Sequence, residues 1–289
     1  MSISEELGES LTVAVPGAGR IAYRERGSGP PIVFAHGVGV NGDLWRHVAP
    51  ALAAGGHRCI APDLPLGGHS IPLTGEPDMS LPGLAAILGS FVEALGLEDV
   101  TLVANDTGGA ITQAFVGRRP ERIARLVLTS CDAFDRYPPP AVAYLKPTAR
   151  IPGGLALLGQ AVRFKAVQRL PIAYGWATRE PIEPRIMESY TRNVRTSPGV
   201  RADLGRVLKH ARKSDMEAAS RSVANFDRPA LVVWAADDRF FPVEHGRALA
   251  DLMPQGRFEL VEDSRTFIPE DQPARLVELI SGFLGQSGR

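Results

Sequence analysis

The chain has 289 residues, of which 44% are hydrophobic, so it can bury a large core as a single domain. Lys plus Arg and Asp plus Glu both total 32, and this balance argues against nucleic acid and against an anionic membrane as partners. A small apolar molecule is therefore the expected partner, a homodimer is compatible with the composition, and no cofactor or metal is predicted.

Residues 1–10 are polar and acidic and lack the basic and apolar regions of a signal peptide. No uninterrupted apolar run reaches the roughly 20 residues that a membrane-spanning helix needs. We therefore expect a cytoplasmic protein.

Strand-like and helix-like segments alternate along most of the chain. Strands are predicted at 11–15, 20–24, 31–35, 58–61, 100–103, 123–128, 230–234 and 257–261. Helices are predicted at 44–53, 81–95, 111–117, 243–252 and 273–284. This order predicts an α/β protein whose mostly parallel sheet is covered by helices on both faces.

The pattern changes between Cys131 and Asp227, where proline-rich turns at 137–140 precede apolar, helix-like pieces without clear strands. Such an insertion predicts a helical cap over the carboxyl edge of the sheet. The expected division is a core of residues 1–133 and 226–289 with a cap of residues 134–225.

Residues 103–109, with the sequence Val-Ala-Asn-Asp-Thr-Gly-Gly, place Asp106 between a predicted strand and a predicted helix. Gly108 and Gly109 allow the helix to pack closely against the strand, and the turn lifts the aspartate side chain outward. Asp106 is therefore the candidate nucleophile. The alternative is that Asp106 caps the helix by accepting hydrogen bonds from its first backbone amides.

With this turn, the His-Gly loop at 34–39 and the acidic loop at 231–242, the chain resembles the α/β-hydrolase superfamily over essentially its whole length. The aspartate at the turn is similar to that of the haloalkane dehalogenase and epoxide hydrolase branch. The resemblance implies an α/β-hydrolase fold with a mostly parallel eight-stranded sheet, helices on both faces and an inserted helical cap.

The resemblance also implies roles for three residues. The backbone amides of Val38 and Thr107 would form an oxyanion hole, and Asp238 would orient a catalytic histidine. Alternatively, Asp238 or its neighbour caps the helix that follows or pairs with an arginine. His36, in the His-Gly loop, is interpreted as a packed or hydrogen-bonded loop histidine in preference to a catalytic one.

The pattern breaks at Thr266, which occupies the position of the catalytic histidine in the loop after the last predicted strand. A threonine hydroxyl cannot act as a general base near neutral pH. An ionised Asp106 could still attack an electrophile, but losing the base slows hydrolysis of the resulting ester by a factor of about 100 to 10,000.

His69 is a candidate for the missing role. It follows the loop at 63–68 near the sheet edge, although a structural loop histidine is the favoured interpretation. Asp132 follows a predicted strand after which some branches of the superfamily carry the triad acid, and a turn-capping role fits it at least as well. If Asp132 lies close to Asp106, their charges would raise one pKa and create an acid–base pair, which suits a lyase or isomerase.

Substrate clues are fewer. Thr107 and Val38 stand where dehalogenases of this branch hold the halide, so halide abstraction is disfavoured. The cap offers phenol donors for epoxide opening, with packed tyrosines as the favoured alternative, at Tyr137, Tyr144, Tyr174 and Tyr190. The leading hypothesis is an enzyme acting on an apolar epoxide or ester through Asp106. The alternatives are a non-hydrolytic lyase, isomerase or cyclase, and a binding protein on a hydrolase scaffold.

Overall fold

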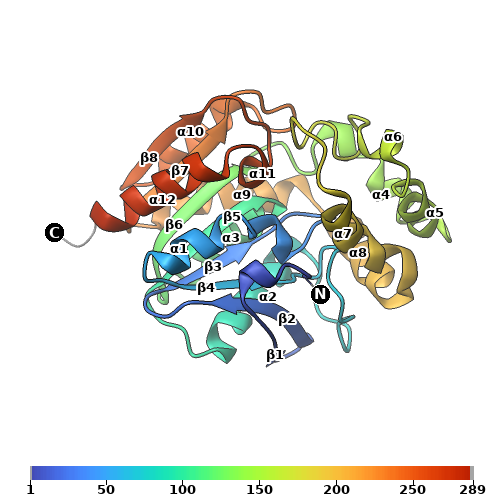
Figure 1. Cartoon of the computed structure of the whole chain (residues 1–289), viewed down its shortest axis with the longest axis horizontal. Helices are drawn as coiled ribbons and strands as arrows, with labels where there is room; N and C mark the ends of the chain where they lie inside the picture. Colours follow the sequence, from blue (N-terminus) through green and yellow to red (C-terminus); the bar gives the residue numbers. More distant parts are fainter. Residues whose placement is uncertain (1, 287–289) are drawn as a thin grey trace.

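A computed structural model describes residues 2–286 and shows one sheet flanked by helices, with a helical cap to one side (Figure 1). The sheet has eight strands in the order β1-β2-β4-β3-β5-β6-β7-β8. Pairing is antiparallel from β1 through β2 to β4 and parallel for the remaining strands. The strands are β1 (Glu9–Val15), β2 (Gly19–Arg26), β3 (Pro31–Ala35), β4 (Arg58–Pro62), β5 (Val100–Asp106), β6 (Ile123–Cys131), β7 (Ala230–Ala235) and β8 (Gly256–Val261).

The central strands are buried on both sides, which explains why their sequences are nearly continuous apolar runs. The sheet is covered by α1 (Ala49–Ala54) and α12 (Pro273–Gln286) on one face and by α2 (Leu81–Ala94), α3 (Thr107–Val116) and α9 (Lys213–Ser222) on the other (Figure 1). Helix α10 (Val243–Leu252) packs on β7 and β8. The predicted α/β architecture, a mostly parallel eight-stranded sheet with helices on both faces, is confirmed.

The predicted helix at 44–53 is wrong as a single element. The chain forms a short 3-10 helix, η2 (Gly42–Trp45), and then starts again as α1. Pro50 lies in the first turn of α1, where a backbone N–H has no partner within the helix, so its absence loses no hydrogen bond. In the interior of one helix over residues 44–53, the same proline would remove a backbone hydrogen bond.

The cap lies over the carboxyl edge of the sheet (Figure 1). Its helices are α4 (Leu145–Thr148), α5 (Gly154–Ala161), α6 (Lys165–Gln168), α7 (Pro184–Thr196) and α8 (Pro198–His210). Helix α9 falls inside the range predicted for the cap but packs against α3 on the sheet. The division of the chain at residues 134 and 225 stays a prediction.

Short 3-10 helices and one further α-helix complete the fold, namely η1 (Glu5–Leu7), η3 (Pro140–Val142), η4 (Val223–Asn225) and α11 (Ile268–Asp271). Between residues 2 and 286, no helix has both the length and the apolar character needed to cross a bilayer.

Candidate active site

Asp106 sits at a sharp turn between strand and helix. Strand β5 ends at Asp106 and α3 begins at the next residue, and Asp106 has a φ of 55° and a ψ of −131°. A non-glycine residue in this region is strained by about 1–3 kcal/mol, and such strain gathers at functional sites. The Asp106 side chain makes no capping hydrogen bond to α3. The helix-cap alternative therefore lacks support.

Three glycines allow the elbow to pack this tightly. A Cβ at Gly108 would lie 2.3 Å from the carbonyl oxygen of Ala35, and one at Gly109 would lie 2.3 Å from the Cβ of Cys131. A Cβ at Gly37 would lie 2.2 Å from Oδ2 of Asp106 itself. The start of α3 is therefore fitted between β3 and β6, and the His-Gly loop touches the candidate nucleophile.

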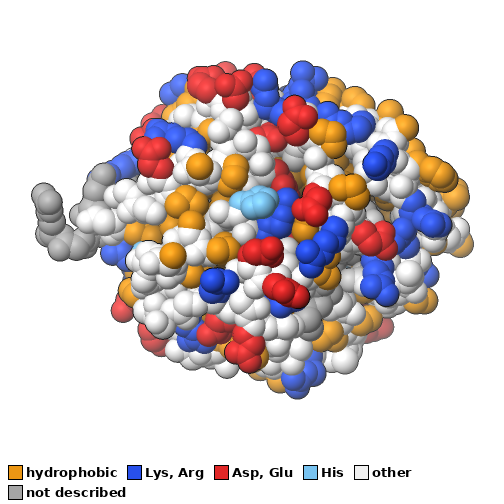
Figure 2. All heavy atoms as spheres, viewed as in Figure 1, with side chains coloured by type: hydrophobic (Ala, Val, Ile, Leu, Met, Phe, Trp, Pro, Cys, Tyr) orange, Lys and Arg blue, Asp and Glu red, His pale blue; other side chains and the backbone are white. Residues whose placement is uncertain are grey.

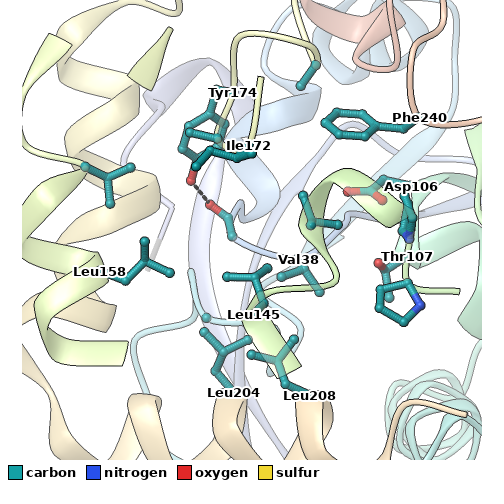
Figure 3. Close-up of a pocket in the computed structure, with 18 of the residues that line it drawn as sticks. Val38, Asp106, Thr107, Leu145, Leu158, Ile172, Tyr174, Leu204, Leu208 and Phe240 are labelled. Carbon is teal, nitrogen blue, oxygen red and sulfur yellow. Dashed lines mark hydrogen bonds between the residues drawn. The ribbon is translucent and has the colours of Figure 1, made fainter. Parts of the chain in front are cut away.

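A cavity of about 200 Å³ opens above Asp106, between the sheet edge and the cap (Figure 3). Its walls are mostly apolar and come from the cap, the His-Gly loop and the loop after β7. The side chains labelled in Figure 3 are typical of these walls and include Val38, Leu145, Leu158, Ile172, Leu204, Leu208 and Phe240. The polar groups gather on the floor, where Asp106, Thr107, Asp132 and Thr266 lie.

Three carboxyl groups lie at the ends of neighbouring strands, with Asp106 and Asp132 on the floor of the cavity and Asp238 behind Thr266. Burial raises the pKa of Asp106 to about 7, and the negative charge of Asp238 adds to the shift. Burial and the charge of Asp106 raise the pKa of Asp132 well above its usual range. Burial raises the pKa of Asp238 to about 6. Desolvation acts in this direction because it disfavours the charged form of a carboxyl group.

Asp132 is buried and lines the cavity. It is 1% exposed, and its Oδ2 accepts a hydrogen bond from the Thr107 hydroxyl at 3.1 Å. Its Oδ1 has no hydrogen-bond partner among the described residues. Its raised pKa favours the protonated form of Asp132. An acid–base pair requires that Asp132 lie close to Asp106, and the two residues are close enough for the charge of one to raise the pKa of the other.

Asp238 and Thr266 form a hydrogen-bonded pair beside the cavity. The Thr266 hydroxyl donates to Asp238 Oδ1 at 2.9 Å, and the backbone amides of Phe240 and Phe241 donate to the same oxygen at 2.9 Å each. Thr266 lines the cavity and Asp238 does not, so Thr266 separates Asp238 from the cavity. Asp237, the alternative acidic residue, instead pairs with Arg179 and is 52% exposed.

Neither candidate histidine faces the cavity. His36 is buried, its Nε2 accepts from the Leu64 amide at 2.8 Å, and its Nδ1 donates to the Gly37 carbonyl at 2.8 Å. Burial lowers the pKa of His36 to about 4, so the ring is neutral. His69 contacts Asp203 of α8 through Nε2 at 3.1 Å. Both rings hold loops in place, and no histidine lines the described part of the cavity.

Val38 and Thr107, the two residues whose backbone amides are predicted to form the oxyanion hole, both line the cavity beside Asp106 (Figure 3). The Val38 amide has no backbone partner in the described part of the chain, so it is free to donate to a ligand. Their role as an oxyanion hole stays a prediction.

The four cap tyrosines differ in what their hydroxyls contact. Tyr190 donates to Glu270 at 3.0 Å, Tyr174 to the Gly39 carbonyl at 2.6 Å (Figure 3), and Tyr144 to the Ile172 carbonyl at 2.7 Å. The Tyr137 hydroxyl makes no hydrogen bond to a described residue. Its ring lines the cavity, close enough to Asp132 and Asp106 for their charges to raise its pKa. Tyr137 is therefore the cap phenol available to a ligand.

Comparisons with known proteins agree with this architecture. A family described as alpha/beta hydrolase fold matches residues 30–169. An uncharacterised protein of Mycobacterium tuberculosis is 28% identical over 282 residues, which cover 92% of this chain and 78% of that protein. A haloalkane dehalogenase of Mesorhizobium japonicum is 39% identical over 109 residues, which cover 37% of this chain and 34% of that enzyme.

A crystal structure of an alpha/beta hydrolase fold protein from Burkholderia ambifaria matches with a TM-score of 0.78 and 26% identity, over 95% of this chain and 97% of that one. Together with the family match and the observed sheet, this similarity shows that the chain has the α/β-hydrolase fold. Within the described residues, no group of three or more His, Cys, Asp or Glu side chains is arranged to hold a metal ion.

Proposed function

We propose that the chain is an enzyme that attacks a small or medium apolar electrophile, an epoxide or an ester, through the Asp106 carboxylate. The observation that carries the proposal is the position of Asp106 at a strained strand-to-helix turn on the floor of an apolar cavity. A pKa of about 7 leaves a substantial fraction of Asp106 ionised at neutral pH, and the ionised form is the nucleophile.

An epoxide suits the floor of the cavity best. The Asp106 carboxylate attacks a ring carbon, the new carbon–oxygen bond forms, and the ring carbon–oxygen bond breaks. The ring oxygen takes the proton of Asp132, which leaves an ester at residue 106 and a carboxylate at residue 132. One negative charge thus passes between the two aspartates, and the free Tyr137 hydroxyl can donate to the same ring oxygen.

An alkyl halide suits the cavity less well, although one relative is a haloalkane dehalogenase. A departing halide needs N–H donors, and neither tryptophan nor asparagine lines the described cavity. The Trp234 indole donates instead to the Phe241 carbonyl at 3.0 Å.

Clearing the ester is the slow step of this proposal. Water must attack the ester carbonyl while a base accepts its proton, and the Val38 and Thr107 amides stabilise the oxyanion. Thr266 separates Asp238 from the cavity, so the base at hand is Asp132, which the first step has ionised. The alcohol product leaves with a proton, and Asp106 and Asp132 together regain one proton and one charge.

The test is intact-mass measurement after incubation with panels of epoxides, aryl esters and alkyl halides. A mass increase equal to an added epoxide, or slow release of diol, supports attack by Asp106. If no epoxide or ester gives an adduct or a product, the proposal is wrong.

A second candidate function is favoured by the electrostatic coupling of the two aspartates. Burial and the charge of Asp106 raise the pKa of Asp132, which favours one ionised and one neutral carboxyl group, the pairing that a general base and a general acid require. A lyase, isomerase or cyclase would use this pair to move a proton without forming an ester. Exchange of substrate hydrogen with deuterated solvent, without a mass adduct, would identify this function.

A further inference from the structure

The outer surface of the cap exposes apolar side chains that a water-facing surface rarely groups together. Within the described chain, large apolar side chains that are exposed cluster between residues 151 and 172. The most exposed are Leu157 at 74%, Phe164 at 68% and Ile151 at 61%, and Leu252, at 37%, is the exception outside the cap. Single exposed apolar residues need no explanation, whereas a group of them marks an interaction surface.

The same segment is strongly cationic. Residues 136–179 contain no Asp or Glu, although basic and acidic residues are equal in number over the whole chain. The segment contains seven Lys and Arg, namely Arg136, Lys146, Arg150, Arg163, Lys165, Arg169 and Arg179. The exposed members from 150 to 169 form no salt bridge with a described residue. We call the exposed apolar and basic side chains of residues 150–172 the cap patch.

The cap patch belongs to α5, α6 and the turns around them, at the end of the cap away from β7 and β8 (Figure 1). In the space-filling view, apolar and basic side chains gather at the corresponding right-hand edge (Figure 2). The inner side of the same segment lines the cavity through Leu155, Leu158, Val162 and Val167. Ile172 is 47% exposed and also lines the cavity, so the patch reaches its rim.

We propose that the cap patch docks on an anionic lipid surface. Exposed Phe and Leu side chains enter the boundary between headgroups and acyl chains, and the unpaired Lys and Arg side chains bind the anionic headgroups. The balanced overall charge predicts no membrane partner, but it averages out this local asymmetry and so does not bear on the cap patch. A second copy docking through the same patch would bring like charges together, and nucleic acid would leave the apolar side chains without a partner.

Docking of this kind gives an apolar substrate a route from the bilayer through the rim at Ile172 to Asp106. This consequence rests on the proposed function, whereas docking itself does not. The test therefore measures binding to lipid and needs no turnover.

The experiment is co-sedimentation of the full chain with vesicles of phosphatidylglycerol and phosphatidylcholine in equal parts, beside vesicles of phosphatidylcholine alone. We expect binding to the anionic vesicles, and loss of binding at 1 M salt because the Debye length falls from about 10 Å to about 3 Å. Replacing both Arg163→Gln and Lys165→Gln should weaken binding about 25-fold, at about fivefold for each cation. Phe164→Ser with Leu157→Ser should also weaken it.

Matched controls remove the same groups elsewhere. Leu252→Ser removes the exposed apolar side chain outside the cap, and Arg118→Gln with Arg119→Gln removes two exposed cations after α3. These variants should bind as the parent chain does. Equal binding by patch and control variants, or no binding to anionic vesicles, would overturn the proposal. So would a dimer in solution that the patch substitutions convert to a monomer, because the patch would then be a protein interface.

Discussion

Thr266 occupies the hydrogen-bonding position that a catalytic histidine would take toward Asp238. Its hydroxyl donates to Asp238 Oδ1 at 2.9 Å, while Asp238 Oδ2 has no partner among the described residues. Under the proposed function, Asp238 would be the acid of a triad that has no histidine for it to orient. The proposed site would then have the parts needed for nucleophilic attack and would lack the base that speeds hydrolysis of the ester.

Replacing Thr266→His should speed release of product from the ester. An imidazole at residue 266 would be oriented by Asp238 and could accept the proton of water, a contribution of about 100- to 10,000-fold. The measurement is the decay of the mass adduct together with diol formation. Thr266→Ser, which keeps the hydroxyl, is the control and should decay as the parent does. If Thr266→His leaves hydrolysis at background in a folded protein, a missing base is not the limiting defect.

Adduct formation should rise with pH and level off above neutrality. Burial raises the pKa of Asp106 to about 7, so the nucleophilic form is scarce at pH 5 and dominant at pH 8. Burial and the charge of Asp106 raise the pKa of Asp132 well above its usual value, which favours its protonated form. Single-turnover rates measured by quenched mass spectrometry should therefore have a midpoint near pH 7. A profile that is flat from pH 5 to pH 8 would contradict the account.

Asp106→Asn should abolish adduct formation and stabilise the fold at high pH. The native carboxyl, with a pKa of about 7, holds its proton more tightly than the unfolded chain does at 3.8. Ionisation of this carboxyl group therefore destabilises the folded protein. The destabilisation is absent below about pH 4, grows between pH 4 and pH 7, and reaches its full value, at most roughly 4 kcal/mol, above pH 7. Urea unfolding of both proteins should show a larger gain for the variant at pH 8 than at pH 4. An equal gain at both values would mean that burial of the charge is not the cause.

Asp132→Asn should separate acid assistance from nucleophilic attack. An amide keeps the size of the side chain and the contact with Thr107 but has no proton to give to an opening epoxide. Epoxide attack should slow by a factor of about 100 to 10,000. Alkylation by a primary alkyl iodide, whose leaving group needs no proton, should change far less. If both reactions slow equally, Asp132 positions Asp106 instead of acting as an acid.

The sequence predicts the parts of the fold that depend on local pattern. The apolar runs identify all eight strands, and the turn at Asp106 follows from its spacing and from Gly108 and Gly109. The apolar periodicity of residues 44–53 predicts one continuous helix and does not reveal the break. Pro50, which is tolerated in the first turn of a helix, is the residue that indicates where the second helix starts.

The contacts that shape the site join residues far apart in the chain, and local patterns carry no information about such pairs. Arg46 pairs with Glu270 at 2.6 Å in a buried salt bridge. Glu270 also accepts a hydrogen bond from the hydroxyl of Tyr190, one of the candidate proton donors. By sequence, Asp132 fits a turn as well as a catalytic site. Its hydrogen bond with the Thr107 hydroxyl, which the sequence does not reveal, shows that its side chain points toward the site. The same reasoning explains why His69 contacts Asp203 of the cap instead of the cavity.

Covalent attack by Asp106 is tested most directly by peptide mass spectrometry after single turnovers with an epoxide in ¹⁸O-labelled water. The account predicts either the ester on residue 106 or, once that ester is hydrolysed, ¹⁸O in the Asp106 carboxyl group, with neither signal in Asp106→Asn. Consumption of the epoxide while Asp106 carries neither adduct nor label would contradict it.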